Sequence, residues 1–559
     1  MKTIYKSICI VSLICGFTSC NDILDTVPQG QFTVEQLNNE SVEGLMASAY
    51  AGLEAHFFGN NEAFSGPSTN WIFDVRSDDA YKGGGATSME EGIHLLEVSE
   101  ITSDNITLFN KWQNDFFAIS RVHNAMSAIK KASGVSNADQ LMGELRTLRA
   151  WYYFDLIRIF DRIPYFREDD DASSKTNVEF TRDEIFSFIK EDLEAAIALL
   201  PAKKSAVGRI TKTTAQAMMA KVCAQTSSWE DVKTYADAVI ESRQYDLFAN
   251  FGDLSKIAFN NGDESIFALQ TSVVNNYSHA NWSNMLNCTY SDGNLYGNGD
   301  DFYLASQNLV NAFRTDDKGL PYLDGTFNKV NVTQGYQGNV DPRLDFTVGR
   351  IGMPWRGYTY TAGWVRSYDL YGEYSNKKAW PHPDECGKVV PWGGNALNFM
   401  FIRYADILLL KAEALIETAA GSNAATDNDL VEARSIVNRI RQRAAKSIDG
   451  NYTPVDLDPF SANYLVGLYP TDYDGNLYWT KERARMAVRF ERRLELALEG
   501  NRWFDLLRWG NDYLMQTVNT YMQEETSLRS YYNGRSVSEK EILLPVPLAE
   551  IDNSNGLYK

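Results

Sequence analysis

The stretch Glu491–Gly510, which reads ERRLELALEGNRWFDLLRWG, constrains the fold of this chain more than any other part of it. Apolar residues recur there every four positions and so share one face of a helix, and three glutamates with the same spacing share a neighbouring face. The apolar set is Phe490, Leu494 and Leu498, and the acidic set is Glu491, Glu495 and Glu499. Gly500 suits the left-handed end of a helix, and Asn501 can cap the next helix. The stretch therefore predicts two amphipathic helices packed as a hairpin.

Charged side chains crowd this predicted hairpin. Arg492, Arg493 and Arg502 accompany the three glutamates, so one interpretation is an acid–base site. The other is a salt-bridged helix pair that braces the C-terminal core, buried or half-buried and remote from any ligand. We favour the second interpretation, which predicts that Glu495→Ala lowers thermal stability and leaves ligand affinity intact.

Earlier segments repeat the helical spacing of apolar residues, with small residues at contact positions and tight turns between neighbours. The predicted helices cover Glu40–Phe58, Asn110–Lys131, Gly143–Tyr165, a segment running from a Thr181 cap to Leu200, Thr211–Ser227, Trp229–Arg243, Phe401–Thr418 and Asp429–Ala444. Close helix pairs of this kind are typical of tetratricopeptide-like packing. An irregular helical bundle with the same number of helices is the alternative, and either arrangement makes the fold mostly α.

Residues 275–398 differ in kind from these helices. Trp and Tyr are frequent there, separated by Gly, Asn and Asp, and no helical period survives. A shorter segment, Phe57–Gly85, has the same character. Loops this long inside a compact protein are usually functional. Aromatic rings among Asn, Asp and Arg suit a sugar, whose C–H faces pack on rings while its hydroxyls take polar partners.

The two loop segments supply the predicted ligand-binding residues. These candidates are Trp71, Asp74, Arg76, Asp78, Tyr81, Trp282, Tyr296, Trp355, Arg356 and Trp364, with Asp79 and Arg366 as further polar partners. Each aromatic candidate has a second interpretation, which is packing of the loops onto the helical scaffold. The sequence does not distinguish the two for any one ring.

Charge and motif content argue against other function classes. Lys and Arg number 53 against 73 Asp and Glu, a net charge of −20 that would repel nucleic acid. The five histidines lack metal-ligand spacing, and no hydrolase, zincin or P-loop motif is present. Neighbouring acids such as Asp78 and Asp79 leave a surface glycosidase as a remote alternative. A calcium site is only faintly suggested, by Asp292, Asn294 and the pair 300–301, so we predict no required metal. From the motif content we also predict no cofactor and no catalysis.

The N-terminus reads as a signal rather than as part of the fold. Lys2 and Lys6 precede an apolar run over Ile8–Phe17, and small residues then lead to Cys20. This pattern is similar to a bacterial lipoprotein signal, which would leave Cys20 as the lipidated first residue; an ordinary secretory peptide is the alternative. No later run reaches the roughly 20 apolar residues that span a bilayer.

Besides Cys20, the predicted mature chain holds three cysteines, which are well separated and form no disulfide framework or metal knuckle. Cys223 lies in a helical stretch and is predicted to be a core residue, whereas Cys288 and Cys386 fall in loop sequence and could pair.

Taken together, several sequence blocks resemble the SusD/RagB family of nutrient-capturing lipoproteins from Bacteroidetes-type bacteria. The blocks occur in the family's order along nearly the whole mature chain. They are TSCNDILD (Thr18–Asp25), SDDA (Ser77–Ala80), LRAWYYFDLIRIFDRIPY (Leu148–Tyr165), GRITKTTAQAMMAKV (Gly208–Val222), DPRL (Asp341–Leu344), FIRYADILLLKAEAL (Phe401–Leu415), Glu491–Gly510 and LLPVP (Leu543–Pro547).

The resemblance implies a signal peptide over residues 1–19 and one composite domain over 20–559. Within this domain, residues 20–274 would form an N-terminal helical part with a binding loop near 57–85, residues 275–398 a loop-rich ligand-binding region, and residues 399–559 a C-terminal helical part. It also implies an outer-membrane lipoprotein, facing the cell exterior, that captures oligosaccharide and acts as the lid of a SusC-type TonB-dependent transporter. Oligopeptide capture, as in the RagB-like branch of the family, is the alternative. The family's sugar-contact positions do not transfer to this sequence, so the candidate residues above rest on composition and pattern.

Overall fold

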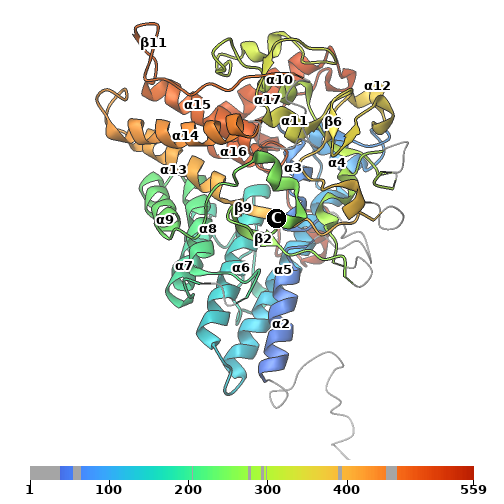
Figure 1. Ribbon diagram of the computed structural model, residues 1–559. Coiled ribbons are helices and arrows are strands. Elements are labelled where there is room, and N and C mark those ends of the chain that lie inside the picture. Colours follow the sequence, from blue (N-terminus) through green and yellow to red (C-terminus); the bar gives the residue numbers. More distant parts are fainter. Residues whose placement is uncertain are drawn as a thin grey trace, which may run out of the picture.

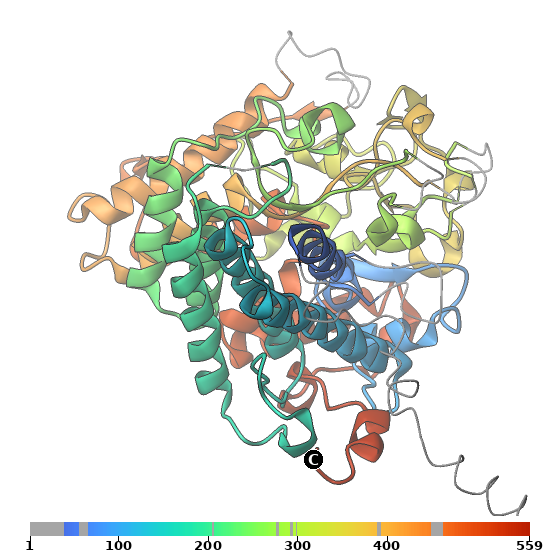
Figure 2. The same ribbon diagram turned by 90° about the horizontal axis from the view of Figure 1, so that it is seen from below.

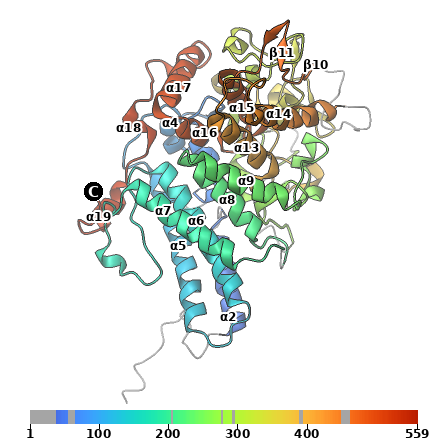
Figure 3. The same cartoon turned by 90° about the vertical axis from the view of Figure 1, so that its left-hand side faces the viewer.

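The longest helices of the protein pack against one another in a row. The computed structural model describes residues 38–54, 65–203, 206–274, 279–290, 295–297, 299–387, 393–448 and 462–559. From α2 onward each long helix packs on the next, through α5, α6, α7, α8 and α9 to α13, and α13 then contacts both α14 and α15. Figure 3 shows this row from the side. The predicted mostly α fold is confirmed.

The long helices of the row are α2 (Asn39–Ala51), α5 (Ile106–Lys131), α6 (Ala138–Ile159), α7 (Arg182–Leu199), α8 (Lys212–Gln225), α9 (Trp229–Glu241), α13 (Tyr404–Thr418), α14 (Asn428–Lys446) and α15 (Lys481–Glu495), followed by α16 (Arg502–Arg508) and α17 (Asn511–Glu525). Shorter helices are α3 (Trp71–Asp74), α4 (Glu91–Glu97), α10 (Gln307–Ala312), α11 (Arg343–Thr347), α12 (Tyr368–Tyr371), α18 (Glu539–Ile542) and α19 (Leu548–Asn553). Among the described residues, no helix is long and apolar enough to cross a membrane.

Local capping fixes several helix starts where the sequence predicts them. Thr181 and Glu184 form a capping box at α7, with the Thr181 amide donating to Glu184 Oε2 at 2.8 Å and the Glu184 amide to Thr181 Oγ1 at 3.3 Å. Thr211 and Thr214 do the same for α8. These side chains satisfy amides that have no partner within the helix.

Tertiary pairing moves two other helix boundaries. The helix predicted over Gly143–Tyr165 ends at Ile159, because the Ile159 carbonyl accepts from the amide of Leu544 at 2.8 Å and the Asp161 amide donates back to the Leu544 carbonyl at 2.9 Å. The helix predicted from Phe401 begins at Tyr404, because the preceding five residues form a strand instead. Pairing with a distant segment decides both boundaries, and helical periodicity carries no signal for it.

Short strand pairs tie the loop-rich part to the helices, and the twelve strands form six two-stranded sheets in the described part of the chain. Four pairs are antiparallel within or next to the loops: β1 (Ala80–Gly83) with β3 (Phe302–Ala305), β2 (Ser265–Leu269) with β9 (Phe399–Arg403), β5 (Val348–Gly349) with β8 (Ser375–Asn376), and β6 (Pro354–Trp355) with β7 (Tyr358–Thr359). The others are the parallel pair β4 (Asn339–Val340) with β10 (Asn463–Tyr464) and the hairpin β11 (Asp472–Tyr473) with β12 (Asn476–Leu477). In Figure 1 the loop-rich part, marked by β6, α11 and α12, lies beside the helical row on the right, and Figure 2 shows the two parts from below.

Both helices predicted for the C-terminal hairpin form, but they do not pack closely on each other, which corrects that prediction. α15 packs on α13 and α14, α16 packs on α17 and α3, and residues 496–501 separate the two, with the Arg492–Asp505 ion pair joining them. α15 ends at Glu495, and the left-handed residues are Leu498 (φ 57°) and Gly500 (φ 73°). A Cβ on Gly500 would lie 3.2 Å from the Trp71 amide nitrogen, so this glycine also permits a close approach of the N-terminal loop. Asn501 makes no side-chain cap, which corrects that prediction. Asp74 supplies the cap instead, because its Oδ1 accepts from the Trp503 amide at 2.8 Å.

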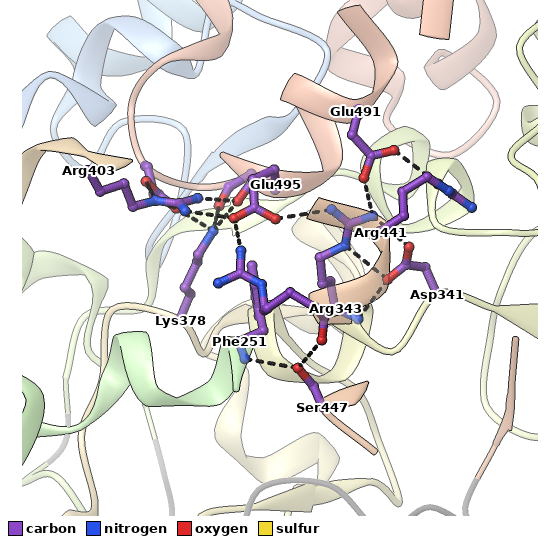
Figure 4. Close-up of polar contacts among 12 residues, drawn as sticks. Phe251, Asp341, Arg343, Lys378, Arg403, Arg441, Ser447, Glu491 and Glu495 are labelled. Carbon is purple, nitrogen blue, oxygen red and sulfur yellow. Dashed lines mark hydrogen bonds and ion pairs between the residues drawn. The ribbon is translucent and has the colours of Figure 1, made fainter. Parts of the chain in front are cut away.

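The glutamate ladder of α15 lies in a buried ion-pair network (Figure 4). Glu495 pairs with Arg403 at 2.6 Å, with Arg343 at 3.1 Å and with Arg443. Glu491 pairs with Arg343 at 2.6 Å and with Arg441 at 2.9 Å. The salt-bridged interpretation of the hairpin is therefore confirmed.

Candidate functional site

The candidates from the first loop segment are buried against the C-terminal hairpin. The Arg502 guanidinium donates two hydrogen bonds to the Asp78 carboxylate, at 2.8 and 3.0 Å, in a bidentate ion pair, and Arg493 donates to Asp79 at 2.6 Å. Burial raises the pKa of the Asp78 carboxyl, but Arg493 and Arg502 outweigh it and hold the value at about 2. An ionised carboxylate clamped by two guanidinium groups is a structural contact. It joins residues more than 400 positions apart.

The other members of this set have equally specific partners. Asp74 caps α16, as described above, and its Oδ2 accepts from the Tyr303 hydroxyl at 2.6 Å. Burial, reinforced by the nearby Asp79 charge, raises the pKa of Asp74 to about 7. Arg76 lies over the Trp503 ring at 3.8 Å, and burial lowers the pKa of its guanidinium to about 9. The Trp71 indole donates to the Ser283 carbonyl at 3.0 Å, and the Tyr81 hydroxyl donates to Glu525 at 2.7 Å.

The candidates from the second loop segment mostly meet in a buried aromatic cluster. Its members are Cys288, Tyr296, Trp355, Tyr360, Trp364, Val365, Trp380 and Cys386. The Trp355 indole donates to the Tyr296 hydroxyl at 2.9 Å, and that hydroxyl donates to the Pro381 carbonyl at 2.9 Å. Arg356 donates from Nε to the Trp380 carbonyl at 3.0 Å. Trp282 packs elsewhere, with Ala280 and Met285.

All ten predicted ligand-binding residues are between 0 and 4% exposed. Ligand contact by any of them stays a prediction, and their burial favours the alternative interpretation, in which they pack the loops onto the scaffold. The lipidation site predicted at Cys20 and the first part of the loop near 57–85 lie outside the described residues. Cys288 and Cys386 are not joined by a disulfide in this structure.

Exposed aromatic side chains lie on segments attached to the buried cluster. Tyr290 is 42% exposed, Tyr358 38% and Tyr368 45%. The Tyr290 amide donates to the carbonyl of Trp364, a cluster member, at 3.0 Å. Tyr358 is the strand partner of Trp355, another cluster member. We call Tyr290, Tyr358, Arg366, Tyr368 and His382 the loop surface.

Polar side chains accompany these rings. The Arg366 guanidinium lies 5.4 Å from the centre of the Tyr290 ring and is paired with Asp300. His382 lies 6.2 Å from Tyr358, ring centre to ring centre. Beneath Arg366, buried Asp301 accepts from the Arg366 amide at 3.0 Å and from the Ser375 hydroxyl at 2.7 Å. Burial raises the pKa of Asp301 to about 7, against the lowering effect of these two hydrogen bonds.

Sequence reasoning selected Arg366 but passed over the three exposed tyrosines and His382. Tyr358 has a usable signal, because the preceding Gly357 (φ 84°) sits in the turn of the β6–β7 hairpin and Tyr358 is the first strand residue after that turn. Tyr290 and Tyr368 have none, because aromatic density is the same for buried and exposed rings. In the described residues no cluster of three or more His, Cys, Asp or Glu side chains could hold a metal ion.

The structure is thus a helical scaffold that carries a loop region with a packed aromatic base and exposed aromatic rings. Residues 263–559 match the family model described as "SusD family", and residues 21–223 match one described as "Starch-binding associating with outer membrane". The first match covers more than half of the chain. The protein therefore belongs to the SusD family, as the sequence blocks predict.

Relatives and solved structures agree with this membership. A SusD-like protein P2 of Formosa agariphila is 26% identical over 540 residues, which are 91% of this chain and 91% of the relative. The crystal structure of a SusD-like protein from Bacteroides fragilis superposes with a TM-score of 0.69 at 19% identity, covering 94% of this chain and 96% of that one. Surface glycan-binding protein A from Bacteroides thetaiotaomicron, solved in complex with laminarihexaose, gives a TM-score of 0.64 at 18% identity, covering 93% and 98%.

Proposed function

We propose that this protein captures oligosaccharides at the cell surface without catalysis and delivers them to a SusC-like TonB-dependent transporter, acting as its lid. The observation that carries the binding step is the loop surface, where exposed Tyr290 lies beside the ion-paired guanidinium of Arg366 and exposed Tyr358 lies beside His382. The similarity to a protein solved with laminarihexaose supports a glycan as the class of ligand. The family description that mentions association with the outer membrane supports the location.

The chemistry of the loop surface suits a neutral sugar. A phenol ring offers a face to axial C–H groups, while Arg366 and Asp300 can exchange part of their mutual pairing for bonds to hydroxyls. The buried cluster underneath holds the segments that carry these side chains, so little conformational entropy is lost on binding. Lipidation at Cys20 would tether the protein to the outer membrane.

Glycan capture can be tested by affinity electrophoresis against a panel of polysaccharides, followed by calorimetry with the oligosaccharide of the best one. Tyr290→Ala with Tyr358→Ala removes two ring faces, each worth about 0.5–1.5 kcal/mol, and should weaken binding about 5- to 100-fold. Tyr513→Ala, at an exposed tyrosine of α17, is the matched control and should leave affinity unchanged.

Four results would count against the proposal. Binding to none of the polysaccharides would refute glycan capture, and binding of oligopeptides in the same assays would favour the peptide-capturing alternative. Release of reducing sugar by the purified protein would refute the absence of catalysis. For delivery, co-purification with a transporter encoded beside it is expected, and failure of the membrane-bound pair to associate would refute the lid role.

A further inference from the structure

A hollow distant from the loop surface is lined by three tyrosines. Its volume is about 530 Å³, within the range of small-molecule sites. We call it the tyrosine hollow and define it by Tyr322, Tyr473, Tyr478, Asp316, Asp324 and Arg483. Its walls come from the loop after α10, the β11–β12 hairpin and the start of α15. In Figure 1 the β11 hairpin lies at the upper left, while β6 and α12 of the loop-rich part lie on the right.

Cations hold the aromatic walls in place. Lys318 Nζ lies 3.6 Å from the centre of the Tyr473 ring, and the Arg483 guanidinium lies 4.4 Å from that of Tyr478. The two rings are 5.4 Å apart and inclined at 31°. Such contacts fix rings that would otherwise rotate on a short hairpin. The hollow is therefore shaped before any ligand arrives.

The polar groups of the hollow are also fixed, and each keeps capacity to bind. Asp316 Oδ1 accepts from the Lys318 and Leu320 amides at 2.9 and 2.8 Å. Asp324 Oδ1 accepts from the Thr326 amide at 3.1 Å and from its hydroxyl at 2.6 Å. In the described part of the chain, Oδ2 of both aspartates and the guanidinium of Arg483 take part in no hydrogen bond. In these residues the two carboxylates are oriented through Oδ1, and the Arg483 guanidinium contacts the Tyr478 ring.

Two apolar side chains of the hollow are exposed. Leu477 and Met486 line the hollow and are each 40% exposed, although neither supports the buried core. A ligand that fits must therefore offer apolar patches together with groups that can pair with carboxylate and guanidinium. The presence of both charge signs disfavours a strongly anionic or cationic ligand. A neutral saccharide meets these conditions, because its ring faces are apolar and its paired hydroxyls both donate and accept.

We propose that the tyrosine hollow is a second saccharide-binding site, independent of the loop surface. Tyr322 and the Tyr473–Tyr478 pair contact sugar rings, while the free oxygens of Asp316 and Asp324 and the guanidinium of Arg483 bind hydroxyls. The inference rests on the proposed glycan function and extends it: a long polysaccharide would meet two binding sites on one molecule, which raises its avidity through effective concentration.

The test is the binding stoichiometry of a short oligosaccharide, cut from the best polysaccharide, measured by calorimetry on the full mature protein. Two sites per chain are expected. The combined variant Tyr322→Ala and Asp324→Ala should reduce this to one site, and Tyr290→Ala with Tyr358→Ala should remove the other. Asp317→Ala, an exposed neighbour that does not line the hollow, is the matched control and should retain two sites.

The outcomes separate this inference from the proposed function. One site per chain, abolished by the loop-surface variant and unaffected by the hollow variant, overturns the second site and leaves glycan capture standing. One site abolished only by the hollow variant supports the inference and refutes the loop surface. No binding of any glycan overturns both. If the hollow variant fails to fold, hydrogen exchange on the unmodified protein decides instead: glycan should protect residues 316–324 and 472–478, and unchanged exchange there refutes the site.

Discussion

Replacing Glu495 with alanine removes the carboxylate at the centre of the buried network. In the described residues the linked ion pairs join five cations to five carboxylates. The cations are Arg343, Lys378, Arg403, Arg441 and Arg443, and the carboxylates are Glu264, Asp341, Glu491, Glu495 and Glu499. The substitution therefore leaves one net positive charge in the interior. Removing one partner of a buried ion pair costs about 3–5 kcal/mol, because the other charge stays desolvated.

Neighbouring acids set the size of the effect within this range. Arg403 and Arg443 keep contacts with Glu264 at 2.7 and 3.1 Å, and Arg343 keeps Asp341 at 2.7 Å. Each of these guanidinium groups keeps one carboxylate partner. We therefore expect Glu495→Ala to lower the free energy of unfolding by an amount in the lower half of the range, about 3–4 kcal/mol. Affinity for glycan per folded molecule should be unchanged, because none of these residues belongs to the loop surface.

The assay is urea unfolding at pH 7, with Glu482→Ala as the control. Glu482 is exposed and lies on the same helix, so its replacement should change the free energy of unfolding by no more than about 0.5 kcal/mol. A change that small for Glu495→Ala would refute the brace. Reduced glycan affinity at unchanged stability would also contradict it.

The pH dependence gives a second check on Glu495. Burial raises the pKa of its carboxyl, but Arg443, Arg403 and Arg343 outweigh burial and hold the pKa well below its usual range. The stabilisation is therefore fully present above the unfolded-state pKa of about 4.3 and is lost as pH falls below it. The stability difference between unmodified protein and variant should be constant from pH 8 to 5 and shrink below about pH 4. A difference that grows on acidification would have the wrong sign.

Three further predictions concern the loop-rich part and its attachment. Trp355→Phe loses the indole hydrogen bond to Tyr296 and leaves a cavity, so the free energy of unfolding should fall by about 1–3 kcal/mol in urea; an unchanged value would contradict the packing role. Asp301 has a raised pKa, so its folded state binds the extra proton and stability declines as pH rises from about 4 to 7. Asp301→Asn should reduce this decline in thermal melts at pH 5 and 8, while Asp74, whose pKa is also raised to about 7, still contributes; a decline as large as that of the unmodified protein would show that other groups cause it. Asp78→Ala leaves Arg502 buried with Asp79, at 4.0 Å, as its one carboxylate partner in the described residues, and should cost about 3–5 kcal/mol; an equally stable variant would refute the clamp.

The helical part of the fold was predictable because its signals are local. Thr181 and Glu184 are three residues apart, and their capping box needs nothing outside α7. Spacings of three and four residues place apolar side chains on one helix face whatever the rest of the chain does. The predictions failed where a distant segment competes for the same backbone groups, as Leu544 does at the end of α6 and β2 does before Tyr404.

The loop-rich part was predictable in composition and not in geometry. An aromatic residue in a loop packs inward or faces solvent according to contacts that lie far away in sequence. Trp355 is buried because Tyr296, 59 residues earlier, receives its indole N–H, whereas its strand partner Tyr358 is exposed. The sequence around Trp355 and the sequence around Tyr358 have the same composition, so composition does not tell the two apart. The tyrosine hollow brings residues 316–324 next to residues 473–486, and no spacing rule connects these two segments.

The sequence by itself determined the mostly α class, the family and the salt-bridged character of the Glu491–Gly510 hairpin. Helical periodicity, capping residues and family sequence blocks are properties of short stretches of sequence. They are therefore the same however those stretches pack in the tertiary structure. Only the tertiary structure decided which charges the hairpin neutralises and which aromatic rings remain exposed. Burial depends on segments that are distant in the chain: Asp74, Asp78 and Asp79 became partners of α15 and α16 when the N-terminal loop folded against them.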